Sequence, residues 1–301
     1  MMSNKINFSK FFKVANIFSL LTVLVSLLFL FFKGLNYGVD FKGGTLLEIR
    51  IENTNIQIQD IRSSLNISEL GDVSVKQFGK EGDFLIKFEK NANENEKFMS
   101  ELKNIISKKI GSAVNFRRVE SVGPKVSSEL FKQGLTAIAL ALAAMLFYIW
   151  IRFEWQFSIG AIVALIHDVV ITLGIFSILS FEVNLSIVAA VLTIVGYSMN
   201  DTVVIFDRIR ENLSKYSKIK TNEITDISVN ETLSRTIITS LTTLLALFSI
   251  FILGGEILKG FSFAMILGVI IGTYSSIFVA SPVLNYFKVT QKTLLKEDSI
   301  N

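Results

Sequence analysis

Long apolar stretches, separated by short polar segments, dominate this chain of 301 residues. A helix needs about 20 mostly apolar residues to cross a bilayer core of about 30 Å. Six stretches meet this requirement, and each is predicted to form a transmembrane helix: residues 14–32, 134–151, 157–179, 185–206, 236–253 and 258–278. The first stretch lacks a small-residue cleavage site before the charged segment that follows it. We therefore interpret it as an uncleaved anchor rather than a secretory signal.

One hydrophilic insert separates the first two apolar stretches and is long enough to form a small domain. Alternation of apolar and polar residues predicts its strands, and apolar residues at helical spacing predict its helices. The strands are expected at residues 45–52, 73–78, 84–88 and 115–122, and the helices at residues 58–65 and 93–110. The resulting order, β-α-β-β-α-β, is typical of a ferredoxin-like unit.

Lysine and arginine residues predict which ends of the apolar stretches face the cytoplasm, because cytoplasmic loops carry an excess of both. They precede the first stretch, follow the second, lie between the fourth and fifth, and follow the sixth: Lys5, Lys10, Lys13, Arg152, Arg208, Arg210, Lys215, Lys218, Lys220, Arg235, Lys288, Lys292 and Lys296. The short connections at 181–184 and 254–256 carry none, with Lys259 just beyond as the one exception. Both termini are therefore predicted to be cytoplasmic.

This topology predicts an α-helical polytopic membrane protein with six transmembrane helices and a small α+β ferredoxin-like extracytoplasmic domain. The parts follow one another along the chain. They are a cytoplasmic N-terminus (1–13), the first transmembrane helix (14–32), the extracytoplasmic domain (33–131), a five-helix transmembrane bundle (132–287) and a cytoplasmic tail (288–301).

Composition narrows the classes of function. Half of the residues are hydrophobic, the formal net charge is only +4, and no basic patch interleaved with aromatic residues indicates a nucleic-acid ligand. The chain has no cysteine, which excludes disulfides, thiolate metal sites and cysteine nucleophiles. It also has one histidine only, no HExxH motif and no GxGD motif, so an intramembrane protease is disfavoured. Neither an enzyme nor a cofactor is predicted.

Polar residues inside the apolar stretches are the candidate functional site. Asn200 and Asp201 lie in the apolar run 188–212, and a charge at the centre of a spanning helix costs about 2.5 to 3.5 kcal/mol. Asp201 is therefore expected to face the bundle, to be neutralised or to meet a cation. Arg235 opens the fifth stretch at a similar depth. A changing distance between Arg235 and Asp201 would permit reversible protonation of the Asp201 carboxylate. Arg208 offers a second partner. A static salt bridge and, for Arg235, an ordinary positive flank remain alternatives.

A second polar pair, His167 and Asp168, lies near the middle of the third stretch. Adjacent residues on a helix point about 100° apart, so the two cannot both line one narrow path. For His167, a hydrogen-bonded structural role and a proton relay both stay open. A functional or closely coupled role is favoured for Asp168. Gly268 and Gly272 form a GxxxG pattern that predicts close helix approach.

Several motifs along the chain together carry a family resemblance. They are NYGVDFKGGTLLEI (36–49), VGP (122–124) with Glu129 and Leu130, RFEW (152–155), HDVVITLG (167–174), VGYSMNDTVVIFDRIREN (195–212), SRTIITSLTTLLAL (234–247) and YSSIFVASP (274–282). With them the chain resembles the SecF family, the smaller membrane subunits of the bacterial SecD–SecF protein-export complex. Ser127 departs from the pattern, since the family usually has glycine there.

The resemblance implies half of a resistance-nodulation-division-like transporter, with SecD supplying the other six helices. It implies a bacterial inner-membrane subunit that uses the proton motive force to assist preprotein translocation through the SecYEG channel, alongside accessory membrane subunits such as YajC and YidC. By position, Asp201 matches the family's essential membrane carboxylate, with Asn200 beside it. Arg235 matches the arginine of the following helix, and Asp168 matches a motif residue.

Three alternatives stay open after the resemblance. Sodium could replace the proton as coupling ion, because Asp201 with Asn200, Ser198 and Thr202 offers oxygen ligands of the type that alkali cations prefer. A proton-driven small-molecule exporter of the resistance-nodulation-division type would share the intramembrane carboxylates. A non-conducting scaffold of the translocon would keep the packing residues without needing a proton-dependent Asp201.

Overall fold

The structure is a computed structural model, and it describes residues 6–52, 56–65, 70–71, 73–77, 81–90, 96–110, 114–216, 219–291 and 293. The predicted positive residues Lys5, Lys218, Lys292 and Lys296 lie outside the described residues. The chain divides into two compact units. The first, called the helical unit, comprises Met1–Asn36, Ala137–Phe181 and Ser186–Asn301, and the second, called the sheet unit, comprises Tyr37–Thr136 and Glu182–Leu185.

Within the described residues, six helices are long and apolar enough to cross a membrane, which confirms the predicted number. They are α1 (Phe12–Phe32, preceded by the short 3-10 helix η1, Phe8–Phe11), α5 (Pro124–Arg152), α6 (Trp155–Leu179), α7 (Leu185–Lys215), α8 (Thr221–Leu253) and α9 (Gly255–Ser275). The last of these continues through a π-helical turn, Ser276–Ala280, into α10 (Ser281–Tyr286).

Three of these helices extend well beyond their predicted ends. Helix α5 begins at Pro124 rather than at residue 134, which suits proline because the first helical positions need no backbone donor. Helix α7 runs on to Lys215, and α8 already begins at Thr221. The prediction detected only the apolar part of each helix, so it stopped where charged residues begin although the backbone hydrogen bonding continues.

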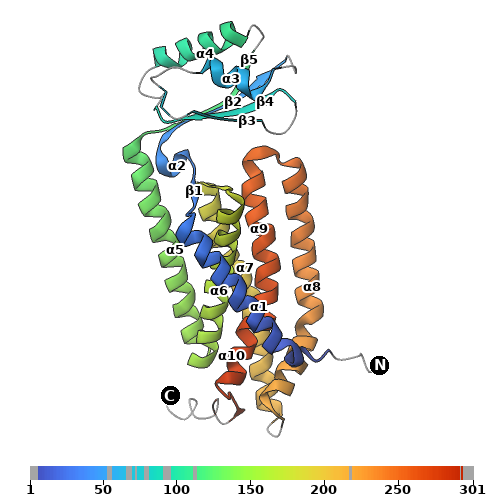
Figure 1. The fold of residues 1–301 in the computed structure, drawn as a ribbon. Coiled ribbons are helices and arrows are strands. Elements are labelled where there is room, and N and C mark those ends of the chain that lie inside the picture. Colours follow the sequence, from blue (N-terminus) through green and yellow to red (C-terminus); the bar gives the residue numbers. More distant parts are fainter. Residues whose placement is uncertain are drawn as a thin grey trace. The chain divides into compact units, whose positions relative to one another are not determined.

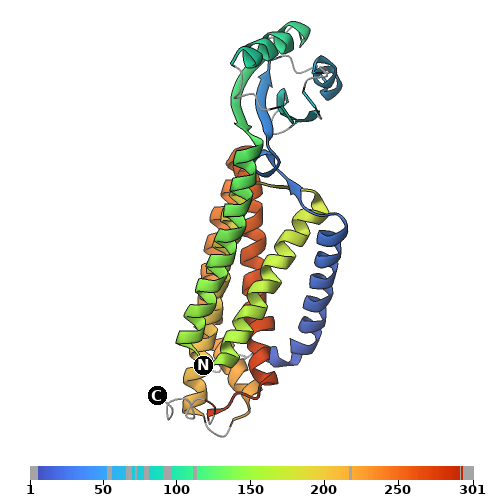
Figure 2. The same cartoon turned by 90° about the vertical axis from the view of Figure 1, so that its left-hand side faces the viewer.

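Helices α6, α7 and α9 form the buried centre of the helical unit, and α1, α5 and α8 are largely exposed. Figures 1 and 2 show α1 alongside α6, and Figure 1 shows α8 alongside α9. Small residues permit the close contacts, as the GxxxG pattern predicts. A Cβ atom on Gly268 would lie 2.2 Å from Ile194 Cγ1, and one on Gly272 would lie 2.9 Å from Ser198 Cβ. Helix α9 therefore packs on α7 through glycine.

The sheet unit has the predicted order of strands and helices. These are β2 (Gly44–Ile51), α3 (Ile58–Ser64), β3 (Val73–Gln77), β4 (Asp83–Phe88), α4 (Glu96–Ile110) and β5 (Val114–Val122). The strands form one antiparallel sheet in the order β3-β4-β2-β5. Helices α3 and α4 lie on one face of it (Figure 1), and their apolar residues join the core with Leu47, Ile49 and Ile86. The predicted ends at Phe78 and at residues 93–95 lie outside the described residues.

A short connection precedes the large sheet. Strand β1 (Asn36–Tyr37) pairs with β6 (Glu182–Val183), and the single turn α2 (Val39–Lys42) follows β1. Gly43 and Gly44 then enter β2 with φ of 80° and 112°, in the left-handed region that favours glycine. A Cβ atom on Gly44 would lie 2.5 Å from the Phe88 carbonyl oxygen, so the glycine pair allows this strand to begin against its neighbour.

Candidate functional site

Asp201 is buried inside the helical unit. Its side chain is 4% exposed, and its closest polar contact comes from α8, where Thr236 Oγ1 donates a hydrogen bond of 3.2 Å to Asp201 Oδ1. The other carboxylate oxygen, Oδ2, is buried without a hydrogen-bond partner in the described structure. The prediction that Asp201 faces the bundle is consistent with this burial. The carboxylate is held by a single neutral hydroxyl.

Arg235 lies next to Thr236 on α8, and its side chain is exposed. Neighbouring residues on a helix point about 100° apart, so Arg235 does not share the direct contact that Thr236 makes, although its charge still acts on the Asp201 carboxylate. Among the described residues, Asp201 takes part in no ion pair. Asn200, adjacent to Asp201 on α7, is likewise exposed. Both polar side chains that the sequence places beside Asp201 are therefore exposed in this unit.

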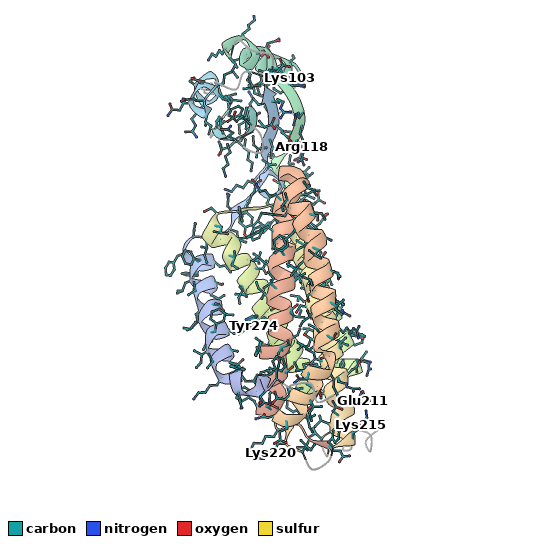
Figure 3. The ribbon with its side chains drawn as sticks, turned by 90° about the vertical axis from the view of Figure 1, so that its right-hand side faces the viewer. Lys103, Arg118, Glu211, Lys215, Lys220 and Tyr274 are labelled. Atoms are coloured by element: carbon teal, nitrogen blue, oxygen red, sulfur yellow. The ribbon has the colours of Figure 1, made fainter. Side chains whose placement is uncertain are left out.

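Arg208 does not serve as a second partner of Asp201, contrary to the prediction. Its guanidinium instead bonds two glutamates, with Nε 2.7 Å from Glu231 Oε2 of α8 and Nη1 2.5 Å from Glu211 Oε2. Glu211 also pairs with Lys215 one turn further on, and Figure 3 shows both residues at the end of the bundle that carries Lys220. The seven-residue spacing gave the correct helix face, but closer carboxylates satisfy the guanidinium.

Asp168 differs from Asp201 because three donors surround it. It is 0% exposed, and its Oδ2 accepts hydrogen bonds from Ser198 of α7 (2.5 Å) and Ser275 of α9 (2.8 Å). Its Oδ1 lies 2.8 Å from His167 Nδ1 on the same helix, α6. Asp168 thus joins the three central helices of the bundle.

His167 connects this cluster to the first helix. Its ring stacks on Tyr274, with centroids 6.2 Å apart, and the Tyr274 hydroxyl donates to the Ala15 carbonyl of α1 at 2.8 Å. The same hydroxyl lies 3.0 Å from Ser19 Oγ. Tyr274 is labelled among the bundle helices in Figure 3. His167 Nε2 is buried without a partner in the described structure, so one ring nitrogen stays available.

Two serines at the end of α9 complete the polar interior. Ser275 bonds Asp168, and Ser276, the first residue of the π-helical turn, lies 2.8 Å from Thr202 Oγ1 of α7, the residue after Asp201. π-helical turns occur frequently at functional sites. Both serines lie in the motif YSSIFVASP (274–282), but no role was predicted for them from the sequence. The available signal was an adjacent serine pair inside an apolar run.

The hydroxyls that the sequence proposed as sodium ligands are engaged elsewhere. Ser198 Oγ donates to Asp168 rather than to Asp201, and Thr202 Oγ1 donates to the Ser198 carbonyl. Within the described residues, no group of three or more histidine, cysteine, aspartate or glutamate side chains could hold a metal ion. The site is therefore built from two separate carboxylates in a bundle of hydroxyl donors.

Comparison with known families matches most of the chain to membrane proteins of protein export. Residues 102–290 match the family described as "Protein export membrane protein SecD/SecF, C-terminal", and residues 28–54 match the "SecD/SecF GG Motif". A protein translocase subunit SecF from Rickettsia bellii is 42% identical over 290 residues, covering 95% of each chain. The corresponding subunit from Vibrio alginolyticus is 44% identical over 277 residues, covering 92% of this chain and 88% of its own.

Solved structures agree with this relationship. The crystal structure of SecDF from Thermus thermophilus, a translocon-associated membrane protein, matches with a TM-score of 0.86 and 34% identity over 95% of this chain. A second structure, of SecDF in a super-membrane-facing form, matches with a TM-score of 0.71 and 32% identity over the whole of this chain. The chain spans 39% of the first SecDF chain and 41% of the second. With its six membrane helices and matching motifs, this multi-pass membrane protein belongs to the SecF family of protein translocase subunits.

Proposed function

We propose that this chain works with SecD to assist preprotein translocation through the SecYEG channel, driven by the proton motive force. It acts as a transport component rather than as an enzyme. The observation that supports this proposal is the environment of Asp201, a buried carboxylate with one hydroxyl contact and one unpartnered oxygen. Such a group can take up or release a proton while few neighbours rearrange, and a membrane carboxylate marks a functional site.

The proposed topology follows the positive residues. Lys10 and Lys13 lie at the start of α1, Arg152 ends α5, and Lys215 and Lys220 flank the connection between α7 and α8. The start of α1 and the end of α10 lie at the same end of the bundle (Figure 1). We infer that this end is cytoplasmic in the bacterial inner membrane. The sheet unit is then a periplasmic ferredoxin-like domain, as its antiparallel order β3-β4-β2-β5 suggests.

The exposed polar residues of α7 and α8 support SecD as the partner. A charged or amide side chain directed into lipid is costly, so Asn200 and Arg235 are expected to meet protein. The chain spans only 39% of the fused SecDF protein, which leaves room for a second helical half against this face. The SecYEG translocon, accessory subunits such as YajC and YidC, and the moving preprotein complete the proposed set of partners, with no nucleic acid.

A proton is the coupling ion that these contacts favour. Sodium would need several oxygen ligands around Asp201, but within the described residues the Thr236 hydroxyl is the one hydrogen-bonded to it, the Ser198 hydroxyl lies at Asp168, and Asn200 is exposed. A proton needs one carboxylate oxygen only. Asp168 is assigned a supporting role, because its three donors bind it to its surroundings. No cofactor is invoked.

The experiment co-expresses this chain with SecD in inverted vesicles and measures completion of preprotein translocation under a proton gradient, a sodium gradient or neither. Asp201→Asn is compared with Glu211→Gln, which alters an exposed carboxylate on the same helix. We expect the proton gradient to stimulate wild type and Glu211→Gln but not Asp201→Asn, with the complex still assembled. Sodium-dependent stimulation would replace the coupling ion, and equal activity of Asp201→Asn under every gradient would favour a scaffold.

A further inference from the structure

One turn of α7 around Asp201 is contacted by side chains from three other elements of the helical unit. Its residues Ser198, Asp201 and Thr202 lie three and four positions apart, so they share one face of the helix. Ser198 contacts Asp168 of α6, and Asp201 contacts Thr236 of α8. The third contact, which Thr202 makes, has no part in the proposed function.

Thr202 is contacted from the π-helical turn that follows α9. Its Oγ1 lies 2.8 Å from Ser276 Oγ, and Ser276 Oγ lies 3.4 Å from the Ser198 carbonyl oxygen of the same α7 turn. Ser276 is 0% exposed and Thr202 is 1% exposed, so bulk water does not compete for this contact. Ser276 is therefore the side chain through which the end of α9 reaches the helical turn that carries Asp201.

The two residues before Ser276 contact other helices. Ser275 Oγ donates to Asp168 of α6 at 2.8 Å. The hydroxyl of Tyr274, labelled in Figure 3, donates to the Ala15 carbonyl oxygen of α1 at 2.8 Å. Neighbouring residues on a helix point about 100° apart, so three consecutive side chains reach three different helices. A change in the backbone here would disturb the contacts of both carboxylate-bearing helices, α6 and α7.

The sequence explains why the backbone leaves the α-helical pattern after α9. Pro282 has no amide hydrogen, and in a continuous α-helix its ring would meet the carbonyl group of Phe278. In a π-helical turn each amide bonds the carbonyl five residues earlier, so Phe278 needs no donor from Pro282. Ser281 Oγ donates a hydrogen bond of 2.8 Å to the Ser276 carbonyl oxygen, also five residues earlier. Ser276 is thus held both at its side chain and at its backbone.

We propose that Ser276 is a positioning residue of the proton site. It holds the Thr202 side of the α7 turn, so the Asp201 carboxylate can exchange its contact with Thr236 on a backbone that stays in place. The π-helical turn, through Ser281, fixes the backbone of Ser276 for this task. The inference rests on the proposed function of Asp201.

A double-variant cycle tests the contact without a transport assay. Ser276→Ala, Thr202→Val and the double variant are compared by thermal unfolding of the complex with SecD, since valine keeps the shape of threonine without its hydroxyl. Both changes remove the same contact, so the fall in Tm of the double variant should be smaller than the sum of the two single falls. Additive falls would overturn the contact.

Ser262→Ala combined with Thr202→Val is the matched control for this cycle. Ser262 is a buried serine of α9, and within the part of the chain that the structure describes its hydroxyl bonds only the carbonyl oxygens of Leu258 and Lys259 on its own helix. The two changes share no contact, so their effects on Tm should add.

The pH profile tests the positioning role. Gradient-stimulated translocation is measured in inverted vesicles with SecD as a function of pH, with the gradient held constant. Ser276→Ala and Thr202→Val should each shift the midpoint by about half a pH unit or more, because the surroundings of a carboxylate set its pKa. Thr202→Ser keeps the hydroxyl and Ser262→Ala leaves the site intact, so both should retain the wild-type midpoint. Reduced stimulation with an unchanged midpoint in Ser276→Ala and Thr202→Val would overturn the positioning role.

None of these variants changes a titratable or charged side chain. Those near the Asp201 turn on the packed helices are retained: His167 and Asp168 on α6, Tyr197 on α7, Arg235 on α8 and Tyr274 on α9. A shifted midpoint therefore reports a change in position rather than in charge. Ser281→Ala should shift it in the same direction as Ser276→Ala, and an unchanged midpoint would remove the π-helical turn from this role.

The two proposals fail in different ways. If Asp201→Asn retains full stimulation at every pH, the proton site is wrong and Ser276 has none to position, while the double-variant cycle still decides whether Ser276 holds α7. If Asp201→Asn loses stimulation and Ser276→Ala keeps the wild-type midpoint, Asp201 keeps its role and Ser276 is not a positioning residue.

Discussion

Replacing Asp168 by alanine should destabilise the helical unit strongly, because three donors lose their acceptor at once. Those donors are Ser198, Ser275 and His167, at 2.5, 2.8 and 2.8 Å from the carboxylate oxygens. Hydrogen bonds between membrane helices contribute about 0.6 kcal/mol on average and up to about 1.7 kcal/mol. The bonds from Ser198 and Ser275 run between helices, and if the His167 bond within α6 is given the same weight the three contribute about 2 to 5 kcal/mol. For a chain of this length that corresponds to a fall in Tm of roughly 4 to 20 °C.

The assay is thermal unfolding of the detergent-solubilised complex with SecD, followed by intrinsic fluorescence. Thr193→Ala is the matched control, since the Thr193 hydroxyl is exposed and bonds only the Ala189 carbonyl of its own helix. Its Tm should stay within a degree or two of wild type. An Asp168→Ala variant that melts together with this control would refute the reasoning, because it would mean that the three hydrogen bonds contribute nothing to stability.

Three further predictions use the same measurement. Asp201→Asn should keep or raise the Tm, since the amide oxygen still accepts the 3.2 Å hydrogen bond from Thr236 and the change removes a buried charge; a clear fall would contradict this. Gly268→Ala should lower the free energy of unfolding by about 1 to 3 kcal/mol, because the added methyl group overlaps Ile194. Adding Ile194→Ala to this variant should recover part of the lost stability. Gly260→Ala should be neutral, because the added methyl group would lie 3.5 Å from the nearest atom, Ile187 Cδ1. Burial and the neighbouring Lys76 lower the pKa of Lys87 to about 8, so the unfolded chain binds more protons between pH 8 and 10.5. Stability should therefore rise with pH across that window in wild type and not in Lys87→Arg.

The sequence predicted the architecture well because its signals are local. Apolar runs long enough to cross a bilayer located six helices, and strand alternation located the four strands of the large sheet. The helix ends were less accurate. Helix α8 starts at Thr221, not at residue 236, because its first turns carry charges such as Glu223 and Asp226 while the backbone hydrogen bonding is already helical. Polarity marks where lipid ends, which is a different boundary from the end of a helix.

The candidate site was predictable only in part. Asp168 and Asp201 stand out in the sequence because a carboxylate in an apolar run is energetically costly. Both are buried in the structure. Their partners carry no such signal, since hydroxyl residues such as Thr236 and Ser275 are common in membrane helices. The direction of Arg235 depends on the rotation of α8 against α7, which side-chain packing sets. The sequence alone therefore does not determine the rotation of α8 against α7.

The two buried carboxylates have opposite surroundings, and that difference separates their roles. Moving Asp168 requires breaking hydrogen bonds from α6, α7 and α9, whereas Asp201 exchanges partners at the cost of one bond from Thr236. A coupling residue must respond to a single proton, and an equilibrium shifts only by the difference in binding between two states. The residue with few contacts can therefore switch. The residue with many contacts holds together the helices against which the switch moves.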